Sequence, residues 1–246
     1  MSETTTKLDA DWLREGPLPR LFVALNRGGD EARVVGGAVR NALLGEPVHD
    51  IDVATTAEPA TVVSRVNAAG FKAVPTGIEH GTVTLVIDGQ GFEVTTLRED
   101  VETFGRHANV RFGRDWKADA ERRDFTINAF SAARDGTVYD YVGGLGDLAE
   151  KRVRFIGDPA RRIAEDYLRI LRYFRFQARF GSIPADKASE EAVSELAAGL
   201  KGLSRERVGW ELMNLLGLPD PAPTVRRMAE LGVLAHVLPE ATEVGL

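Results

Sequence analysis

Asp50 and Asp52 are the pair of residues in this sequence whose types and spacing most directly suggest chemistry. Side chains two positions apart on a β-strand point to the same face, so a strand over residues 49–54 would present both carboxylates together. Neighbouring carboxylates repel each other unless a cation lies between them. Mg²⁺ is commonly held by one or two carboxylates together with substrate phosphates. The pair therefore indicates a magnesium site at which a phosphate group reacts.

A glycine-rich turn precedes the two aspartates. Gly36 and Gly37 follow the apolar pair Val34-Val35 and open a short helical pattern. Such a turn at a helix N-terminus offers backbone N–H groups that suit a phosphate. A phosphate binder beside a metal binder is the layout of a nucleotidyl-transfer site. Taken separately, a Gly-Gly pair before a helix is more often a plain turn, and an Asp-x-Asp sequence is more often a solvent-exposed strand end; their conjunction favours the nucleotidyl-transfer site.

The composition is that of a globular protein and excludes several kinds of site. The chain has 246 residues, of which 43% are hydrophobic and 28% charged, and it has no cysteine. Disulfides, zinc–thiolate sites and cysteine nucleophiles are therefore excluded. No apolar run approaches the roughly 20 residues that a membrane span needs, and the polar N-terminal residues lack an apolar signal core. We expect a cytoplasmic protein with no membrane partner.

Positive charge is concentrated in one segment, although the net charge of the chain is −6. Residues 151–180 contain nine Lys and Arg residues against three acidic ones. A stripe of this kind suits a polyphosphate or an RNA backbone. It is also what a solvated helix face with internal ion pairs would show.

The hydrophobic periodicity predicts a mixed-sheet α+β head followed by an all-helical region. We expect strands over residues 33–35, 49–54, 71–74, 82–87 and 92–97, and helices over residues 8–26, 59–69, 159–180, 185–200, 204–216 and 221–231. Asp88-Gly89 between the last two strands is a hairpin signal. No strand is expected after Pro159.

Further motifs accompany the opening one in a fixed order. They are Arg123-Asp124-x-x-x-Asn128, Asp140-x-x-Gly143-Gly144-x-x-Asp147-Leu148, and Glu165-Asp166-x-x-Arg169-x-x-Arg172. With the Gly-Gly turn and Asp50-x-Asp52, they make the sequence similar to the tRNA nucleotidyltransferase and bacterial poly(A) polymerase family, and most of all to its class II CCA-adding enzymes. The resemblance covers residues 30–240.

The resemblance implies a polymerase-beta-like nucleotidyltransferase head over residues 1–157, a helical neck that recognises the base over 158–219, and the beginning of a helical body over 220–246. Family members normally continue with a longer body and tail that grip the tRNA. We therefore expect a shortened chain that retains nucleotide binding and holds tRNA weakly. Two residues depart from the usual pattern: Asn41 replaces an Asp, and Tyr167 replaces a Pro.

Residue roles follow from the same resemblance. Asp50 and Asp52 would bind two Mg²⁺ ions, and Glu93 in the strand over 92–97 is the candidate third carboxylate. Nucleotide binding would fall to Gly36, Gly37, Arg40, Arg123, Asp124, Asn128, Asp166, Arg169 and Arg172. Among these, Gly37 and Arg40 would hold the triphosphate. The motif from Arg123 to Asn128 would contact the ribose hydroxyls and phosphates.

Asp166 and Arg169 suggest how a base could be selected. Three positions apart on one helix, they would share a face. A carboxylate accepts from the exocyclic amine of C or A, and an arginine donates to the neighbouring ring nitrogen or carbonyl. G and U present carbonyl oxygens where the amine should be. An unpaired carboxylate costs about 1–3 kcal/mol, enough to discriminate against them.

We therefore expect Mg²⁺-dependent addition of C and A from CTP and ATP to the 3′ end of tRNA, with release of pyrophosphate. An A-adding, CC-adding or poly(A)-polymerising enzyme of the same family is an alternative, as is a non-catalytic nucleotide- or RNA-binding module. The base-reading pair disfavours a nucleotidyltransferase that modifies small molecules. The sequence gives no indication of the oligomeric state.

Overall fold

The computed structural model describes residues 6–74, 77–78, 81–100 and 110–241. The chain divides into two compact units. The first, here the head unit, comprises residues 1–123 and 128–142, and the second, the helical unit, comprises residues 124–127 and 143–246. The division into parts at residues 157 and 219 that the family resemblance implies remains a prediction.

The head unit is built on a seven-stranded mixed sheet with the strand order β3-β4-β5-β2-β1-β8-β9. Its strands are β1 (Ala32–Val35), β2 (Asp52–Thr55), β3 (Lys72–Val74), β4 (Thr82–Ile87), β5 (Gln90–Thr96), β8 (Ser131–Ala132) and β9 (Val138–Tyr139). Only β2 and β5 pair in parallel; the other neighbours are antiparallel. A separate hairpin pairs β6 (Arg98–Asp100) with β7 (Val110–Phe112).

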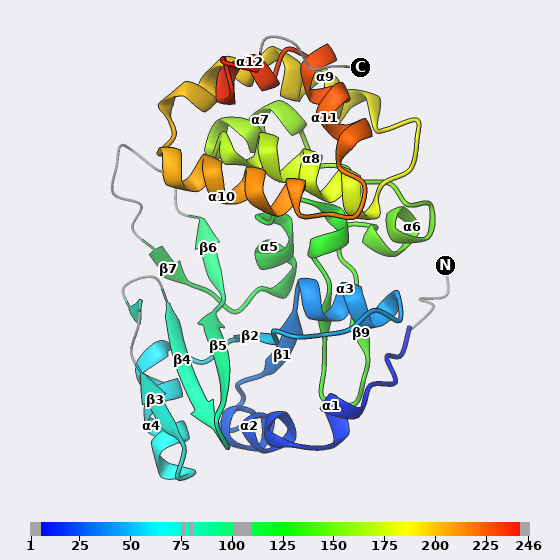
Figure 1. Ribbon diagram of the computed structural model, residues 1–246. Helices are drawn as coiled ribbons and strands as arrows, with labels where there is room; N and C mark the ends of the chain where they lie inside the picture. Colours follow the sequence, from blue (N-terminus) through cyan, green and yellow to red (C-terminus); the bar gives the residue numbers. More distant parts are fainter. Residues whose placement is uncertain (1–5, 75–76, 79–80, 101–109, 242–246) are drawn as a thin grey trace. The chain divides into compact units, whose positions relative to one another are not determined.

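The helices of the head unit are short. They are α1 (Asp11–Arg14), α2 (Pro17–Leu25), α3 (Gly37–Leu43), α4 (Pro59–Ala68) and α5 (Trp116–Glu121). Figure 1 shows α2 and α4, which contact each other, at one end of the sheet. The buried side chains of Leu21, Phe22 and Leu25 on α2 fill the core. The predicted single helix over residues 8–26 is wrong, because Gly16 adopts a positive φ of 79° and separates α1 from α2.

The predicted hairpin is confirmed. β4 and β5 pair up to Ile87 and Gln90, and the two residues between them, Asp88 and Gly89, have φ angles of 52° and 80°. Two positive φ angles in a two-residue loop are typical of the type I′ turn, whose twist matches that of the flanking strands.

The helical unit contains α6 (Gly144–Ala149), α7 (Pro159–Glu165), α8 (Leu168–Phe180), α9 (Lys187–Glu195), α10 (Arg205–Leu216), α11 (Ala222–Glu230) and α12 (Leu234–Val237). A 3₁₀ helix spans Ala197–Gly202, and another, Thr126–Asn128, crosses the division between the units in the sequence. No strand follows Pro159 in the described residues, as predicted. An aromatic core joins Phe125, Phe155 and Tyr173, with ring centroids 4.9 Å and 5.8 Å apart for the pairs Phe125–Phe155 and Phe155–Tyr173.

Candidate functional site

The strand register of the head unit brings three acidic residues to one end of its sheet. Asp52 lies opposite Val35 on β1 and opposite Glu93 on β5. Asp50, Asp52 and Glu93 are exposed, whereas Ile51 is buried. The alternation of exposed and buried residues therefore continues through Asp50, and both aspartates face solvent.

The predicted strand over residues 49–54 is wrong at its N-terminal end, because β2 begins at Asp52 and leaves Asp50 in irregular backbone. The reason lies in the neighbouring strand. β1 ends at Val35, and the chain turns away at Gly36, whose N–H donates to the Phe130 carbonyl. No ladder partner on β1 remains for Asp50. Its distance from Asp52 is thus set by loop geometry as well as by the sheet.

The charges around Asp52 favour a bound cation. Desolvation of the Asp52 carboxylate by nearby protein atoms raises its pKa, and the negative charges of Glu93 and Asp50 raise it further, while the positive charge of Arg123 lowers it. A divalent cation would relieve this repulsion, so the residues present fit one. Among the residues that the structure describes, no three acidic or histidine side chains form a preassembled metal cluster.

The Gly-Gly turn is shaped by its immediate neighbours. Gly36, the residue before α3, has a φ of 69°, which favours glycine. A Cβ atom there would also lie 3.2 Å from Nη1 of Arg123. The backbone at this turn therefore passes close to a guanidinium group as well as preceding a helix. This places the turn, Arg123 and the acidic residues in one neighbourhood of the head unit.

Arg40 lies buried on α3 and is held by side-chain oxygens. Its Nη1 donates to Oδ1 of Asn128, and its Nε and Nη2 donate to Oδ1 of Asn41 at 3.1 Å and 2.8 Å. Asn41, one of the two departures from the pattern that the resemblance implies, supplies an oxygen that orients this arginine. The structure thus brings the side chains of Arg40 and Asn128 together.

Asp119 is a residue that our reading of the sequence missed. It is buried on α5 and accepts from Nη2 of Arg123 at 3.2 Å and from the side chain of Arg122. Asp119 lies four residues before Arg123, which follows the end of α5, and this spacing is the signal that was available. Asp119 restricts the Arg123 guanidinium next to the Gly-Gly turn.

In the helical unit, Asp124 belongs to a network of ion pairs. Its Oδ2 accepts from Nη2 of Arg172 at 2.6 Å, and Arg172 also approaches Glu211 on α10 at 3.5 Å. Glu211 is 1% exposed and accepts from Nε of Arg175 at 2.6 Å. Burial alone would lower the pKa of Arg172, but Asp124 and Glu211 outweigh burial and raise it.

We predict that Glu211→Ala lowers the free energy of unfolding by about 3 kcal/mol, because it leaves two partly buried arginines without their shared carboxylate. Urea unfolding followed by circular dichroism would measure the loss. Glu206→Ala, in the exposed first turn of the same helix, should cost less than about 1 kcal/mol. Equal losses in the two variants would contradict the prediction. Glu211 shares an i, i+4 face with buried Leu215, which is the sequence signal that we missed.

Asp166 and Arg169 do not lie on one continuous helix, so the prediction of a helix over residues 159–180 is wrong. α7 ends at Glu165, and Asp166 takes an extended conformation with φ −158°. Its Oδ1 accepts from the backbone N–H of Leu168 at 3.1 Å, in the manner of a helix cap. Tyr167 has a φ of −61°, the angle that proline imposes, which explains why either residue fits at this position.

Both base-reading candidates are engaged by neighbouring side chains. Oδ2 of Asp166 accepts from Nη2 of Arg207 on α10 at 2.6 Å. Arg169 donates to the side chain of Glu165 and, at 2.7 Å, to the carbonyl of Arg162. The backbone N–H of Arg169 donates to the Asp166 carbonyl at 3.0 Å. Asp166 and Arg169 therefore lie in the same backbone turn at the start of α8, but they do not share the face of one continuous helix.

No helix of the described residues is long and apolar enough to cross a membrane.

Comparison with known protein families gives two matches. Residues 32–154 match the family described as "Poly A polymerase head domain". Residues 185–244 match the family described as "Probable RNA and SrmB- binding site of polymerase A".

Individual proteins are similar along most of the chain. The mitochondrial CCA tRNA nucleotidyltransferase 1 of Mus musculus is 46% identical over 223 residues, which are 89% of this chain and 51% of that protein. The CCA-adding enzyme of Bacillus stearothermophilus, solved in complex with CTP, matches with a TM-score of 0.81 at 35% identity, covering 90% of this chain and 53% of the other.

The CCA-adding enzyme of Thermotoga maritima, solved in complex with tRNA, matches with the same TM-score of 0.81 at 25% identity. It covers 99% of this chain and 58% of the other. The chain thus spans between half and three fifths of the length of these relatives.

Proposed function

The chain belongs to the tRNA nucleotidyltransferase and poly(A) polymerase family, and from this premise we propose that it adds C and A to the 3′ end of tRNA. The reaction joins the 3′-hydroxyl of the RNA to the α-phosphate of CTP or ATP and releases pyrophosphate. The observation that carries the proposal is the register that sets Asp52 beside Glu93, next to the Gly-Gly turn. The names of the similar proteins point to the same activity.

Asp50 and Asp52 are the proposed ligands of Mg²⁺, with Glu93 as the third carboxylate. When bound, the metal lowers the pKa of the attacking hydroxyl and neutralises charge on the triphosphate. The raised pKa of Asp52 supports this assignment, because mutual repulsion among carboxylates is what a cation relieves.

The triphosphate is assigned to the cations and amides of the same neighbourhood. Arg40 and Arg123 would hold the phosphate oxygens, with the backbone N–H groups of Gly36 and Gly37. Asn41 and Asn128 fix the guanidinium of Arg40. Asp119 does the same for Arg123. Holding the reacting phosphate in place is the main contribution expected of a protein in phosphoryl transfer.

The base is assigned to Asp166 and Arg169, and the ribose to Asp124 and Asn128. Asp166 would accept from the exocyclic amine of C or A, and Arg169 would donate beside it. Each oxygen of a carboxylate has two lone pairs, so Asp166 can keep its hydrogen bonds with Leu168 and Arg207 while it accepts another from a base. Asp124 is proposed to contact the ribose, and its ion pair with Arg172 would orient both side chains.

Incorporation of labelled nucleotides tests the proposal directly. The chain is incubated with tRNA that lacks its CCA end, with Mg²⁺ and with each of the four nucleoside triphosphates in turn. We expect C and A to be incorporated and G and U to be rejected. Product lengths distinguish CCA addition from A-adding, CC-adding and poly(A)-polymerising activities. Tight binding of RNA without incorporation at saturating RNA would favour a non-catalytic RNA-binding module.

A cytoplasmic location stays a prediction, since one of the similar proteins is mitochondrial.

A further inference from the structure

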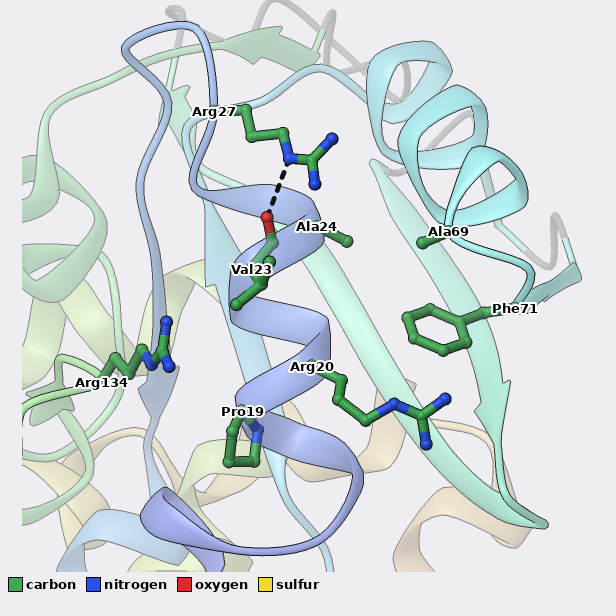
Figure 2. A pocket seen from close by; sticks show the side chains of 8 residues that line it. All are labelled: Pro19, Arg20, Val23, Ala24, Arg27, Ala69, Phe71 and Arg134. Carbon is green, nitrogen blue, oxygen red and sulfur yellow. Dashed lines mark hydrogen bonds between the residues drawn. The ribbon is translucent and has the colours of Figure 1, made fainter.

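A shallow groove lies over the outer surface of α2 in the head unit. It has a volume of about 320 Å³ and is lined by Pro19, Arg20, Val23, Ala24, Arg27, Ala69, Phe71 and Arg134. Three of the eight lining residues are arginines, and none is acidic. Figure 2 shows Arg20 and Phe71 to one side of α2 and Arg134 to the other.

Two of these arginines have no acidic partner within the part of the chain that the structure describes. Arg27 donates its Nε to the Val23 carbonyl at 3.0 Å and forms no ion pair; Arg134 is exposed and forms none. Arg20 lies 5.0 Å from the centre of the Phe71 ring and pairs with Asp88 at 2.5 Å. An exposed pair of that kind is worth at most about 1 kcal/mol, so a ligand can exchange it.

The surface between the arginines is apolar and open. Val23 is 46% exposed although it is a large aliphatic residue, and Ala24 and Ala69 provide little bulk. Small-molecule sites enclose most of their ligand, whereas this surface would leave a small ligand largely in solvent. Its chemistry therefore suits a long anion that passes across it. The guanidinium groups would pair with the negative charges of this ligand, and the apolar surface would contact its less polar groups.

The groove is remote from the proposed transfer site. Arg27 precedes the beginning of β1, whereas Asp52 pairs with Val35 at the end of that strand. Arg134 follows β8, which runs antiparallel to β1 and away from the same end. Four residues of strand span about 13 Å. The reacting nucleotide at the aspartates is thus not the ligand of the groove.

We propose that this groove, with Arg20, Arg27 and Arg134, binds the phosphate backbone of RNA away from the 3′ end that reacts. The choice of RNA among long anions rests on the proposed function. The choice of this surface rests on charge complementarity. The chain has a net charge of −6, so it repels RNA on average and attracts RNA only where its cationic side chains lack acidic partners. Arginine also matches a phosphate in a bidentate geometry.

The test is the binding of CCA-less tRNA to the chain carrying Arg27→Ala and Arg134→Ala, measured by fluorescence anisotropy over a range of salt concentrations. We expect the affinity to fall roughly fivefold to tenfold near 0.1 M salt. The slope of log affinity against log salt should decrease by about 2, because each phosphate that an arginine neutralises accounts for about 1 of that slope. The matched control is Lys117→Ala with Lys187→Ala, which removes the same charge from exposed side chains that pair with Glu121 and Glu191.

An unchanged affinity and slope in the arginine variant would overturn the proposal, as would an equal loss of affinity in the control. Competition for the groove by poly-glutamate but not by RNA would overturn it in favour of an acidic protein partner. Binding is measured without nucleotide, so the outcome is independent of catalysis. A wild-type chain that binds tRNA through these arginines but incorporates no nucleotide would support the groove and contradict the proposed function.

Discussion

Asp52→Asn is expected to lower the rate of CTP incorporation by about a thousandfold or more. Asparagine keeps the size of the side chain and removes the charge that the proposed metal site requires. Metal ions supply several kcal/mol of transition-state stabilisation, and about 4 kcal/mol corresponds to a thousandfold in rate. Single-turnover incorporation into CCA-less tRNA at saturating CTP measures the effect.

The same substitution is expected to leave the fold intact. Desolvation of its carboxylate and the neighbouring negative charges raise the pKa of Asp52 above its ordinary value. A carboxyl group whose pKa is raised by folding destabilises the folded state when it is ionised. This destabilisation is fully present at pH values above the pKa of the folded state, and it is absent at pH values below the pKa of the unfolded state. At pH 7 the asparagine variant should therefore have a free energy of unfolding equal to or slightly above that of the wild type.

Glu58→Gln is the matched control, because it also converts an exposed carboxylate to an amide in the head unit, and it lies just before α4 rather than beside the aspartates. Its incorporation rate should equal that of the wild type. A thousandfold loss in Asp52→Asn together with lower stability would indicate a structural role. Retention of activity in Asp52→Asn would contradict the proposed metal site.

The local features of the head unit could be predicted from the sequence because each depends on neighbours in the chain. Alternation of apolar residues predicted β4 within its observed bounds, and Asp88-Gly89 predicted its turn. The Gly-Gly turn before α3 was predicted for the same reason. In each case the decisive interactions involve residues only a few positions apart.

The features that could not be predicted depend on distant residues. The N-terminal limit of β2 is set by where β1 ends. The pairing of Asp52 with Glu93 joins strands about forty residues apart in the sequence, and the family resemblance alone suggested Glu93. Glu211 and Arg207 reach the expected site residues from α10. The spacing of Glu211 and Leu215 indicates a shared buried face, but it does not identify the residues that Glu211 contacts.

The break at Asp166 shows how a local sequence can satisfy two structures. The apolar residues from Ile163 to Leu171 fit a continuous helical period, which is why one helix was predicted. An aspartate can instead accept a backbone hydrogen bond from two residues ahead and begin a new helix, and here it does so with Leu168. The interruption frees the Asp166 side chain from a helix face and directs one oxygen to Arg207.

Selection of the base should therefore depend on Asp166 more strongly than on any other residue of the helical unit. We expect Asp166→Asn to lower the preference for CTP over UTP by about tenfold to a hundredfold. The amide oxygen can still accept from Leu168, so the beginning of α8 is preserved. The amide nitrogen donates where the carboxylate accepted, and it suits the carbonyl of U better than the amine of C. An unpaired group of this kind costs about 1–3 kcal/mol.

Arg207→Ala separates base selection from support of the carboxylate, since it removes the ion pair and leaves Asp166 as an acceptor. Its preference for CTP over UTP should stay within about threefold of the wild type, while the KM for both nucleotides rises because the carboxylate is less well held. Ratios of kcat/KM for the four nucleotides in each variant measure the difference. Unchanged ratios in Asp166→Asn would exclude Asp166 from base recognition. Equal losses in the two variants would mean that the ion pair, and not the acceptor, determines the selection.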